Sequence, residues 1–136
     1  MTHPSFNSFT IMSAVGAAAK GNVFSYNDFR DVVIQLSASN GAQATVKIQA
    51  SMSDTAPDFS AAQSPTNHWD YIGVYDLNNP NSVIVGDTGI VYAGGATAAN
   101  VLNLLVNTDY IPWLCVTITS WTSGTVNAVA HGFKAY

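Results

Sequence analysis

The stretch DVVIQLSASNGAQATVKIQAS, residues 31–51, alternates apolar and polar side chains up to an Asn-Gly pair and then alternates again. A period of two is typical of strands with one dry face, so this segment predicts two β-strands and no helix. A two-residue Asn40-Gly41 turn would set an apolar face against a polar one, which the register rule rejects. A longer loop ending at a left-handed Gly41 brings the faces into phase and pairs Ile34 with Val46. We therefore expect a β-hairpin with one apolar and one polar face.

A second stretch, WLCVTITSWTSGTVNAVAHG at residues 113–132, shows the same alternation around a Ser-Gly pair. A loop of the same kind ending at Gly124 places Ile118 opposite Ala128, so the pattern predicts a second hairpin. The single cysteine of the chain, Cys115, lies in the apolar part of this stretch. We expect a buried and unreactive thiol, because activation needs a nearby cation or a helix N-terminus.

Further short strands are predicted between these two stretches. HWDYIGVYDL at 68–77 alternates, and SVIVG at 82–86 and GIVYAG at 89–94 are short apolar runs bounded by turn residues. The polar, proline-containing segment 51–67 has no period and indicates a long loop. Segment 96–106 fits a helix or a strand, and we favour a strand because its surroundings are all β and it contains Asn. The whole pattern predicts an all-β fold, an antiparallel, jelly-roll-like β-sandwich.

The low charge of the chain limits its partners. Of 136 residues only 9% are charged, with four Lys and Arg against eight Asp and no Glu. No basic run could neutralise a nucleic-acid backbone, and no apolar stretch approaches the ~20 residues of a membrane helix. The N-terminus lacks a basic start followed by a long apolar run, so we expect no secretory signal and synthesis in a cytoplasm. A neutral exterior favours contact with other protein over a free monomer.

The length fits a single domain. We expect residues 21–136 to form the sandwich and residues 1–20 to form an extended N-terminal arm. The arm contains large apolar residues followed by a stretch of small, flexible ones. Phe6, Phe9 and Ile11 are accordingly the candidates for docking on a neighbouring subunit.

Motifs for catalysis, metal binding and cofactor binding do not occur in the sequence. The three histidines are far apart and lack ligand spacing, and Pro80 interrupts the oxygen-rich segment 76–81, which indicates a turn. Nucleophile-elbow, P-loop and dinucleotide-binding patterns are absent. We therefore expect no enzymatic activity, no bound metal and no cofactor.

Three aromatic residues share one face of the predicted strand 68–77, namely Trp69, Tyr71 and Tyr75. An aromatic platform of this kind can stack on sugar rings. The same residues can also fill the core or a subunit interface, where aromatic burial contributes most. We favour core or interface and keep a glycan-binding platform as the alternative.

Several segments of the chain follow the order found in a known group of proteins. They are GNVFSYNDFRDVVIQLSAS, ATVKIQAS, HWDYIG, DYIPWLCVTIT and GTVNAVAHG, which together span residues 21–132. In this pattern the chain resembles the small β-sandwich structural proteins of tailed bacteriophage particles, of the head-decoration and accessory virion kind. The resemblance implies a capsid decoration protein, located in the virion, that forms a homo-oligomer, with a trimer favoured. Its implied partners are the major capsid protein or another virion protein. The alternative is a glycan- or receptor-binding module of a tail or fibre.

Overall fold

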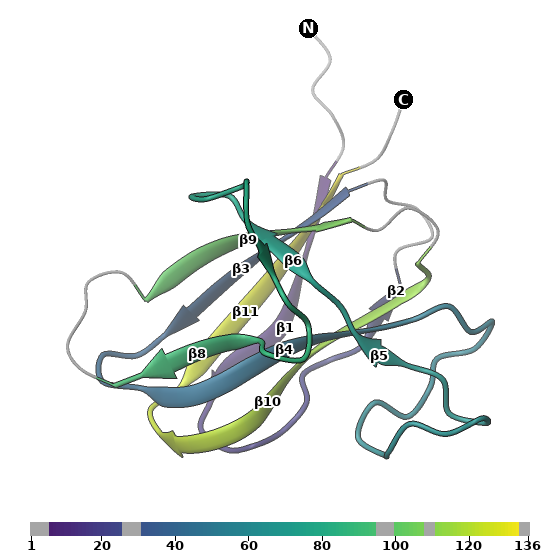
Figure 1. Ribbon diagram of the computed structural model, residues 1–136, viewed down its shortest axis with the longest axis horizontal. Helices are drawn as coiled ribbons and strands as arrows, with labels where there is room; N and C mark the ends of the chain where they lie inside the picture. The colour runs from purple at the N-terminus through teal and green to yellow at the C-terminus, as the bar shows by residue number, and fades with distance from the viewer. Residues whose placement is uncertain (1–5, 26–30, 95–99, 108–110, 134–136) are drawn as a thin grey trace, which may run out of the picture.

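The computed structural model describes residues 6–25, 31–94, 100–107 and 111–133, which form two antiparallel β-sheets packed face to face (Figure 1). Sheet A has, in spatial order, β1 (Phe6–Val15), β11 (Val126–Phe133), β3 (Asp31–Ala38), β9 (Val101–Asn107), β6 (Val74–Asp76) and β7 (Val83–Ile84). Sheet B has β2 (Phe24–Ser25), β10 (Trp113–Ser123), β4 (Gln43–Ser51) and β5 (Asp70–Tyr71), with β8 (Ile90–Ala93) paired to the other half of β4. The described residues contain no helix. The predicted all-β antiparallel sandwich is confirmed.

The core lies between the two sheets and uses the alternating apolar positions of the strands. On β3 and β4, these positions are at most 1% exposed at Val32, Ile34, Leu36, Val46 and Ile48. The strands β9 and β10 add Leu104, Val106, Leu114, Val116 and Ile118. Full burial of a side chain of this size stabilises the fold by about 1.5–3 kcal/mol. Alternation therefore marks the inner face of each sheet.

The first predicted hairpin is wrong, because its two strands belong to different sheets. Ile34 of β3 lies opposite Ala130 and Leu104, and it has no ladder partner on β4. The connection is an arch that carries the chain from sheet A to sheet B. Gly41 has the expected left-handed conformation, with φ 73°. Alternation requires only that both apolar faces be buried, and an arch achieves this by turning them toward each other across the core.

The second predicted hairpin, between β10 and β11, is an arch for the same reason. Ile118 lies opposite Val46 in sheet B, whereas Ala128 lies opposite Leu36 in sheet A. Gly124 stands in this arch with φ 86°, and a Cβ there would come within 2.6 Å of the Ala42 Cβ in the first arch. The two arches therefore pack directly against each other at one end of the sandwich.

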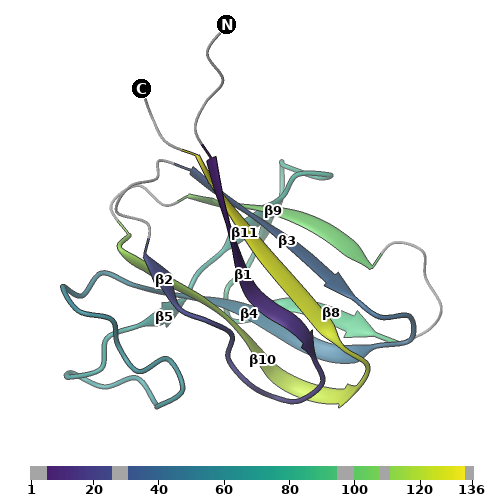
Figure 2. The same ribbon diagram turned by 180° about the vertical axis from the view of Figure 1, so that it is seen from behind.

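Residues 6–15 of the predicted N-terminal arm form a strand, β1, of the sandwich. It pairs antiparallel with β11 of the same chain and forms one edge of sheet A (Figure 2). Ile11 is 2% exposed and belongs to the core, and Phe9 stacks on Phe24 with ring centroids 5.5 Å apart. An extended arm is therefore wrong for residues 6–15, because the sandwich itself uses their apolar side chains. Residues 1–5 lie outside the described range.

A segment that we call the strap, residues 16–23, leads from β1 in sheet A to the edge of sheet B. The Gly21 amide donates to the Val116 carbonyl at 2.8 Å, and the Ile118 amide donates to the Ala19 carbonyl at 2.9 Å. The strap thus extends sheet B beyond β10. Lys20 forms an isolated bridge with Thr117 there, which places its side chain near the outer face of the sheet.

The predicted strand 68–77 is divided between the two sheets. It forms β5, which pairs with β4, and β6, which pairs with β9. The chain crosses at Gly73, where a Cβ would come within 2.9 Å of Val83 Cγ1. Tyr71 and Tyr75 consequently lie on opposite sheets, although alternation in one strand places them on the same face.

Other local predictions are confirmed. Residues 52–69 form no strand and make a long loop between β4 and β5, so the loop predicted for residues 51–67 is present, displaced by one residue at its start and two at its end. The ambiguous segment 96–106 contains β9, a strand, and residues 95–99 lie outside the described range. Cys115 is buried, and the Asn79 amide closes the predicted turn on the Asp76 carbonyl at 2.9 Å.

Candidate functional site

The outer face of sheet A carries a row of residues that crosses all six strands. From β7 to β1, the register places side by side Val83, Tyr75, Leu105, Val33, His131 and Ser8. Val83 is 51% exposed and Tyr75 is 37% exposed, while Leu105 and Val33 are half-buried. The apolar part of this row is therefore accessible to a partner.

The rest of this outer face is neutral. Among the described strand residues that point outward from sheet A, Asp31 at the start of β3 is the only charged one. The imidazole of His131 has polar neighbours on both sides: its Nε2 lies 2.9 Å from Gln35 Oε1 and its Nδ1 lies 2.9 Å from Ser8 Oγ. The face can thus be covered by protein without burying an unpaired charge in its middle.

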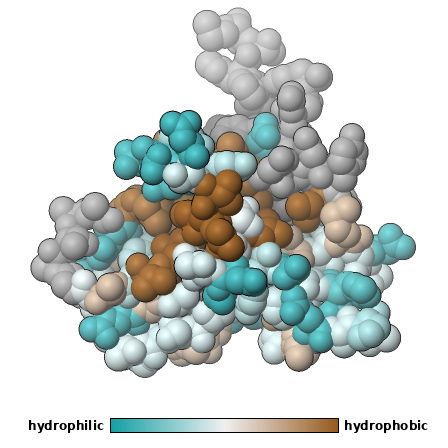
Figure 3. All heavy atoms as spheres, in the orientation of Figure 1, coloured by the Kyte–Doolittle hydropathy of each residue, from teal (hydrophilic) through white to brown (hydrophobic). Residues whose placement is uncertain are grey.

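Exposed apolar side chains also gather on the side of the sandwich where β6, β7 and β8 lie. Leu77, Val85 and Val91 are 45%, 59% and 60% exposed. Figure 3 shows apolar side chains collected in the middle of this side of the molecule. These exposed apolar side chains therefore form a patch that can serve as a contact area, in contrast to single apolar residues scattered over a surface.

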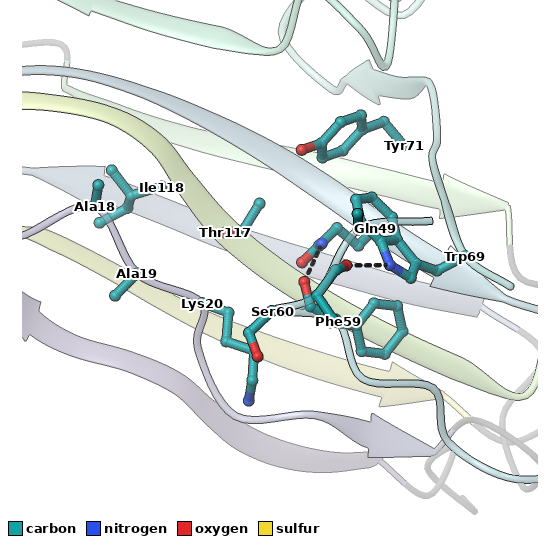
Figure 4. A pocket seen from close by; sticks show the side chains of 12 residues that line it. Ala18, Ala19, Lys20, Gln49, Phe59, Ser60, Trp69, Tyr71, Thr117 and Ile118 are labelled. Carbon is teal, nitrogen blue, oxygen red and sulfur yellow. Dashed lines mark hydrogen bonds between the residues drawn. The ribbon is translucent and has the colours of Figure 1, made fainter. Parts of the chain in front are cut away.

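The outer face of sheet B is different, because it is hollowed by a groove of about 400 Å³ (Figure 4). Gln49 of β4 and Thr117 of β10 lie at its floor. Loop residues 60–62 and strap residues 18–20 form two of its walls. The groove thus exists because two segments distant in sequence border the same stretch of sheet.

Trp69 and Tyr71 complete the lining of the groove as a fixed aromatic corner. Their rings meet edge to face with centroids 5.1 Å apart, and the Trp69 indole donates from Nε1 to the Ala61 carbonyl at 3.0 Å. Phe59 packs on the other side of Trp69 at 6.3 Å, and Lys47 Nζ lies 4.7 Å from the Tyr71 ring centroid. These contacts hold both rings in place before any ligand arrives.

Gln49 and Phe59 fasten the long loop to sheet B. Phe59 is 3% exposed, and its carbonyl accepts a hydrogen bond from Gln49 Nε2 at 2.9 Å. Gln49 is itself 1% exposed, and its Oε1 meets no hydrogen-bond donor among the described residues. Since a carbonyl can only accept, the bond to Phe59 fixes which end of the amide is the nitrogen.

The charges beside the groove are balanced. Hydrogen bonds from the Ser60 hydroxyl and amide lower the pKa of Asp58 from its ordinary value, and the positive charge of Lys20 lowers it further by a smaller amount. Asp58 therefore stays ionised and offsets Lys20 at this end of the groove.

The structure brings together only some of the residues predicted for function. Trp69 and Tyr71 meet at the groove, whereas Tyr75 belongs to the outer face of sheet A. Phe9 and Ile11 are used inside the fold, and Phe6 starts β1. Gln49, Phe59 and Lys20 were not predicted as site residues. Only Phe59 has a sequence signal, because it is the single aromatic residue of the polar segment 51–67.

The fold is shared by the SPBc2 prophage-derived protein YomS. Its crystal structure matches this chain with a TM-score of 0.68 at 13% sequence identity, over 98% of this chain and 97% of YomS. The TM-score over nearly the whole of both chains shows a common fold, and at this identity the match shows the fold alone. No family model matches the sequence, and no curated protein matches it significantly.

Two further findings concern chemistry within the described residues. They contain no group of three or more His, Cys, Asp or Glu side chains that could hold a metal ion, and no helix able to cross a membrane. Burial raises the pKa of the Cys115 thiol to about 11. The thiol therefore remains protonated near neutral pH, in accord with the inert cysteine expected from the sequence.

Proposed function

We propose that this chain is a structural protein of a tailed-phage particle, which self-associates and docks on the head lattice as a decoration protein. The observation that carries the proposal is the almost uncharged outer face of sheet A, with its row from Val83 to Val33. Charged residues are depleted at the centres of protein interfaces, and aromatic residues such as Tyr75 are enriched there. The role needs no catalytic step.

The assignment to a phage particle has two supports. The sequence resembles the β-sandwich structural proteins of tailed-phage virions, and the fold is that of a protein described as prophage-derived. A rigid sandwich with a broad neutral face suits a component that must pack against many identical neighbours.

The mechanism is burial of the outer face of sheet A against a second copy and against the shell. Burial of apolar surface contributes about 25 cal/mol per Å², and specific interfaces bury about 1,200–2,000 Å² in total. A trimer presents three such contacts at once, so each contact with the head lattice can be weak while the whole remains bound. Sheet A replaces the N-terminal arm as the docking element, because β1 belongs to the sandwich.

The first test is the solution mass of the purified chain by light scattering. We expect a discrete oligomer, with a trimer favoured. The variants Val33→Lys and Tyr75→Lys place a charge in the row and should shift the mass to that of a monomer. Thr45→Lys is the matched control, because Thr45 lies on β4 in sheet B, between Ser120 of β10 and Val91 of β8, and away from the row.

The second test is co-sedimentation of the protein with phage heads that lack it. The native chain and Thr45→Lys should pellet with the heads, and the two row variants should remain in the supernatant. A monomeric native protein that ignores heads would contradict the proposal. Row variants that still pellet would contradict the role given to sheet A.

A further inference from the structure

We infer that the groove on the outer face of sheet B binds an uncharged sugar unit of a surface glycan. The groove lies on the sheet opposite to the row of Val33 and Tyr75, so the inference does not depend on the proposed role of sheet A. Its volume of about 400 Å³ lies within the about 300–1,000 Å³ that is usual for small-molecule sites.

The aromatic corner supplies the apolar contact that a sugar ring needs. Trp69 is half-buried and held by its hydrogen bond to Ala61 and by its packing on Phe59. Tyr71 is held between Trp69 and Lys47. Rings fixed in advance lose little conformational entropy when a ligand packs against them.

Gln49 supplies a hydrogen-bond acceptor for the ligand. Its amide is oriented by Phe59, and its buried Oε1 has no donor within the described part of the chain. Figure 4 shows the Gln49 side chain between Thr117 and the loop residues Phe59 and Ser60, at the floor of the groove. Because Oε1 is buried without a donor and Gln49 lines the groove, we assign its donor to a water that it shares with a ligand hydroxyl. Sugars present several hydroxyls on one ring and suit such an acceptor.

The charge balance selects an uncharged ligand. Two cations border the groove, Lys20 in its lining and Lys47 over the Tyr71 ring. Two carboxylates lie beside them: Asp58, whose pKa Lys20 lowers, and Asp70, which stands between the lining residues Trp69 and Tyr71 in the chain. Because two cations and two carboxylates border the groove, a phosphate or a uronic acid would gain little net attraction there, whereas a neutral sugar needs no counter-charge. The groove is therefore assigned to neutral hexose or N-acetylhexosamine units.

The test is binding of the full chain to an array of immobilised oligosaccharides that includes hexose, N-acetylhexosamine and uronic acid polymers. The strongest binder is then titrated by calorimetry. Trp69→Ala removes the aromatic wall, and Ala62→Trp fills the groove from an exposed position without removing any packing. We expect each variant to weaken binding at least tenfold. Tyr75→Ala, an aromatic change on the other sheet, should leave the affinity unchanged.

Thermal unfolding of every variant establishes that it is folded, and Ala62→Trp keeps the test decisive if Trp69→Ala is unstable. The inference is overturned if the folded native protein binds no neutral saccharide, or if Ala62→Trp binds as tightly as the native chain. A preference for uronic acid polymers also overturns it. Solution mass and head binding, measured on the same proteins, report on the role of sheet A separately, since groove variants should change neither.

Discussion

The Ser39 amide donates to the Thr125 carbonyl at 2.9 Å, and the Thr125 amide donates to the Ser39 side-chain oxygen at 2.9 Å. This reciprocal pair joins the two arches that carry the chain between the sheets. Asn100 adds a bond from its side-chain nitrogen to the Ser39 carbonyl at 3.1 Å. One residue thus ties together three connections at one end of the sandwich.

Ser39→Ala tests the joint between the arches. The substitution leaves the partly buried Thr125 amide without its acceptor, so we expect the free energy of unfolding to fall by about 1–2 kcal/mol. Urea denaturation measures the change. Ser37→Ala, a half-buried serine on the outer face of β3, is the matched control and should stay within about 0.5 kcal/mol of the native chain. Equal effects at the two serines would show that the joint contributes nothing specific.

Comparing Gly124→Ala with Gly41→Ala separates the energetic cost of backbone strain from the cost of a steric overlap between the two arches. Both glycines have positive φ, but a Cβ at Gly41 meets nothing within 4 Å, whereas one at Gly124 would lie 2.6 Å from the Ala42 Cβ. We expect Gly41→Ala to cost about 1–2 kcal/mol from the left-handed conformation alone. Gly124→Ala should cost at least about 1 kcal/mol more because of the overlap. Similar unfolding midpoints for the two variants would contradict the contact between the arches.

Cys115 should resist thiol reagents in the folded protein. Its thiol is fully buried, and burial raises its pKa to about 11, so the reactive thiolate is scarce at pH 8. We expect alkylation to proceed only as fast as the protein opens, and to be complete at once in concentrated urea. Mass spectrometry follows the modification over time. Rapid labelling of the folded chain would mean that the strap does not cover β10 as described.

Stability should decline at alkaline pH because of two buried groups. Burial raises the pKa of Tyr92 to about 12 and that of Cys115 to about 11. In the unfolded chain these groups lose their protons near pH 10 and near pH 8.5. Their contribution is therefore complete below about pH 8.5 and is lost as the pH rises toward 11 and 12. Urea midpoints between pH 8 and 11.5 should fall, and Cys115→Ala should make the fall shallower.

Replacing Tyr92 by Phe should not destabilise the protein at neutral pH. The Tyr92 hydroxyl is buried and meets no hydrogen-bond partner among the described residues. Removing an unsatisfied buried hydroxyl should leave stability unchanged or raise it by up to about 1 kcal/mol, because no hydrogen bond is lost. Thermal unfolding at pH 7 measures this. A clear loss of stability would show that the hydroxyl has a partner, such as a bound water.

The candidate site could be predicted only in part. Trp69 and Tyr71 are two residues apart in the sequence, and they meet at the groove as their spacing suggested. The alternation pattern groups Tyr75 with them, because it runs through Gly73, where the chain changes sheets. Gln49 and Lys20 are 29 positions apart, so their meeting at one groove depends on the strap and β4 bordering the same strand.

By itself, the sequence determined that this protein is built from antiparallel strands with one apolar face each, that Gly41 turns left-handed, and that Cys115 is buried. These are local consequences of a two-residue period and of backbone sterics. Only the tertiary structure decided which strands pair, since an arch and a hairpin bury the same alternating residues. It also decided that β1 is an edge strand and not an arm, because Ile11 finds its apolar neighbours on strands far along the chain. Pairing depends on contacts between distant segments, and alternation within one segment carries no record of its partner.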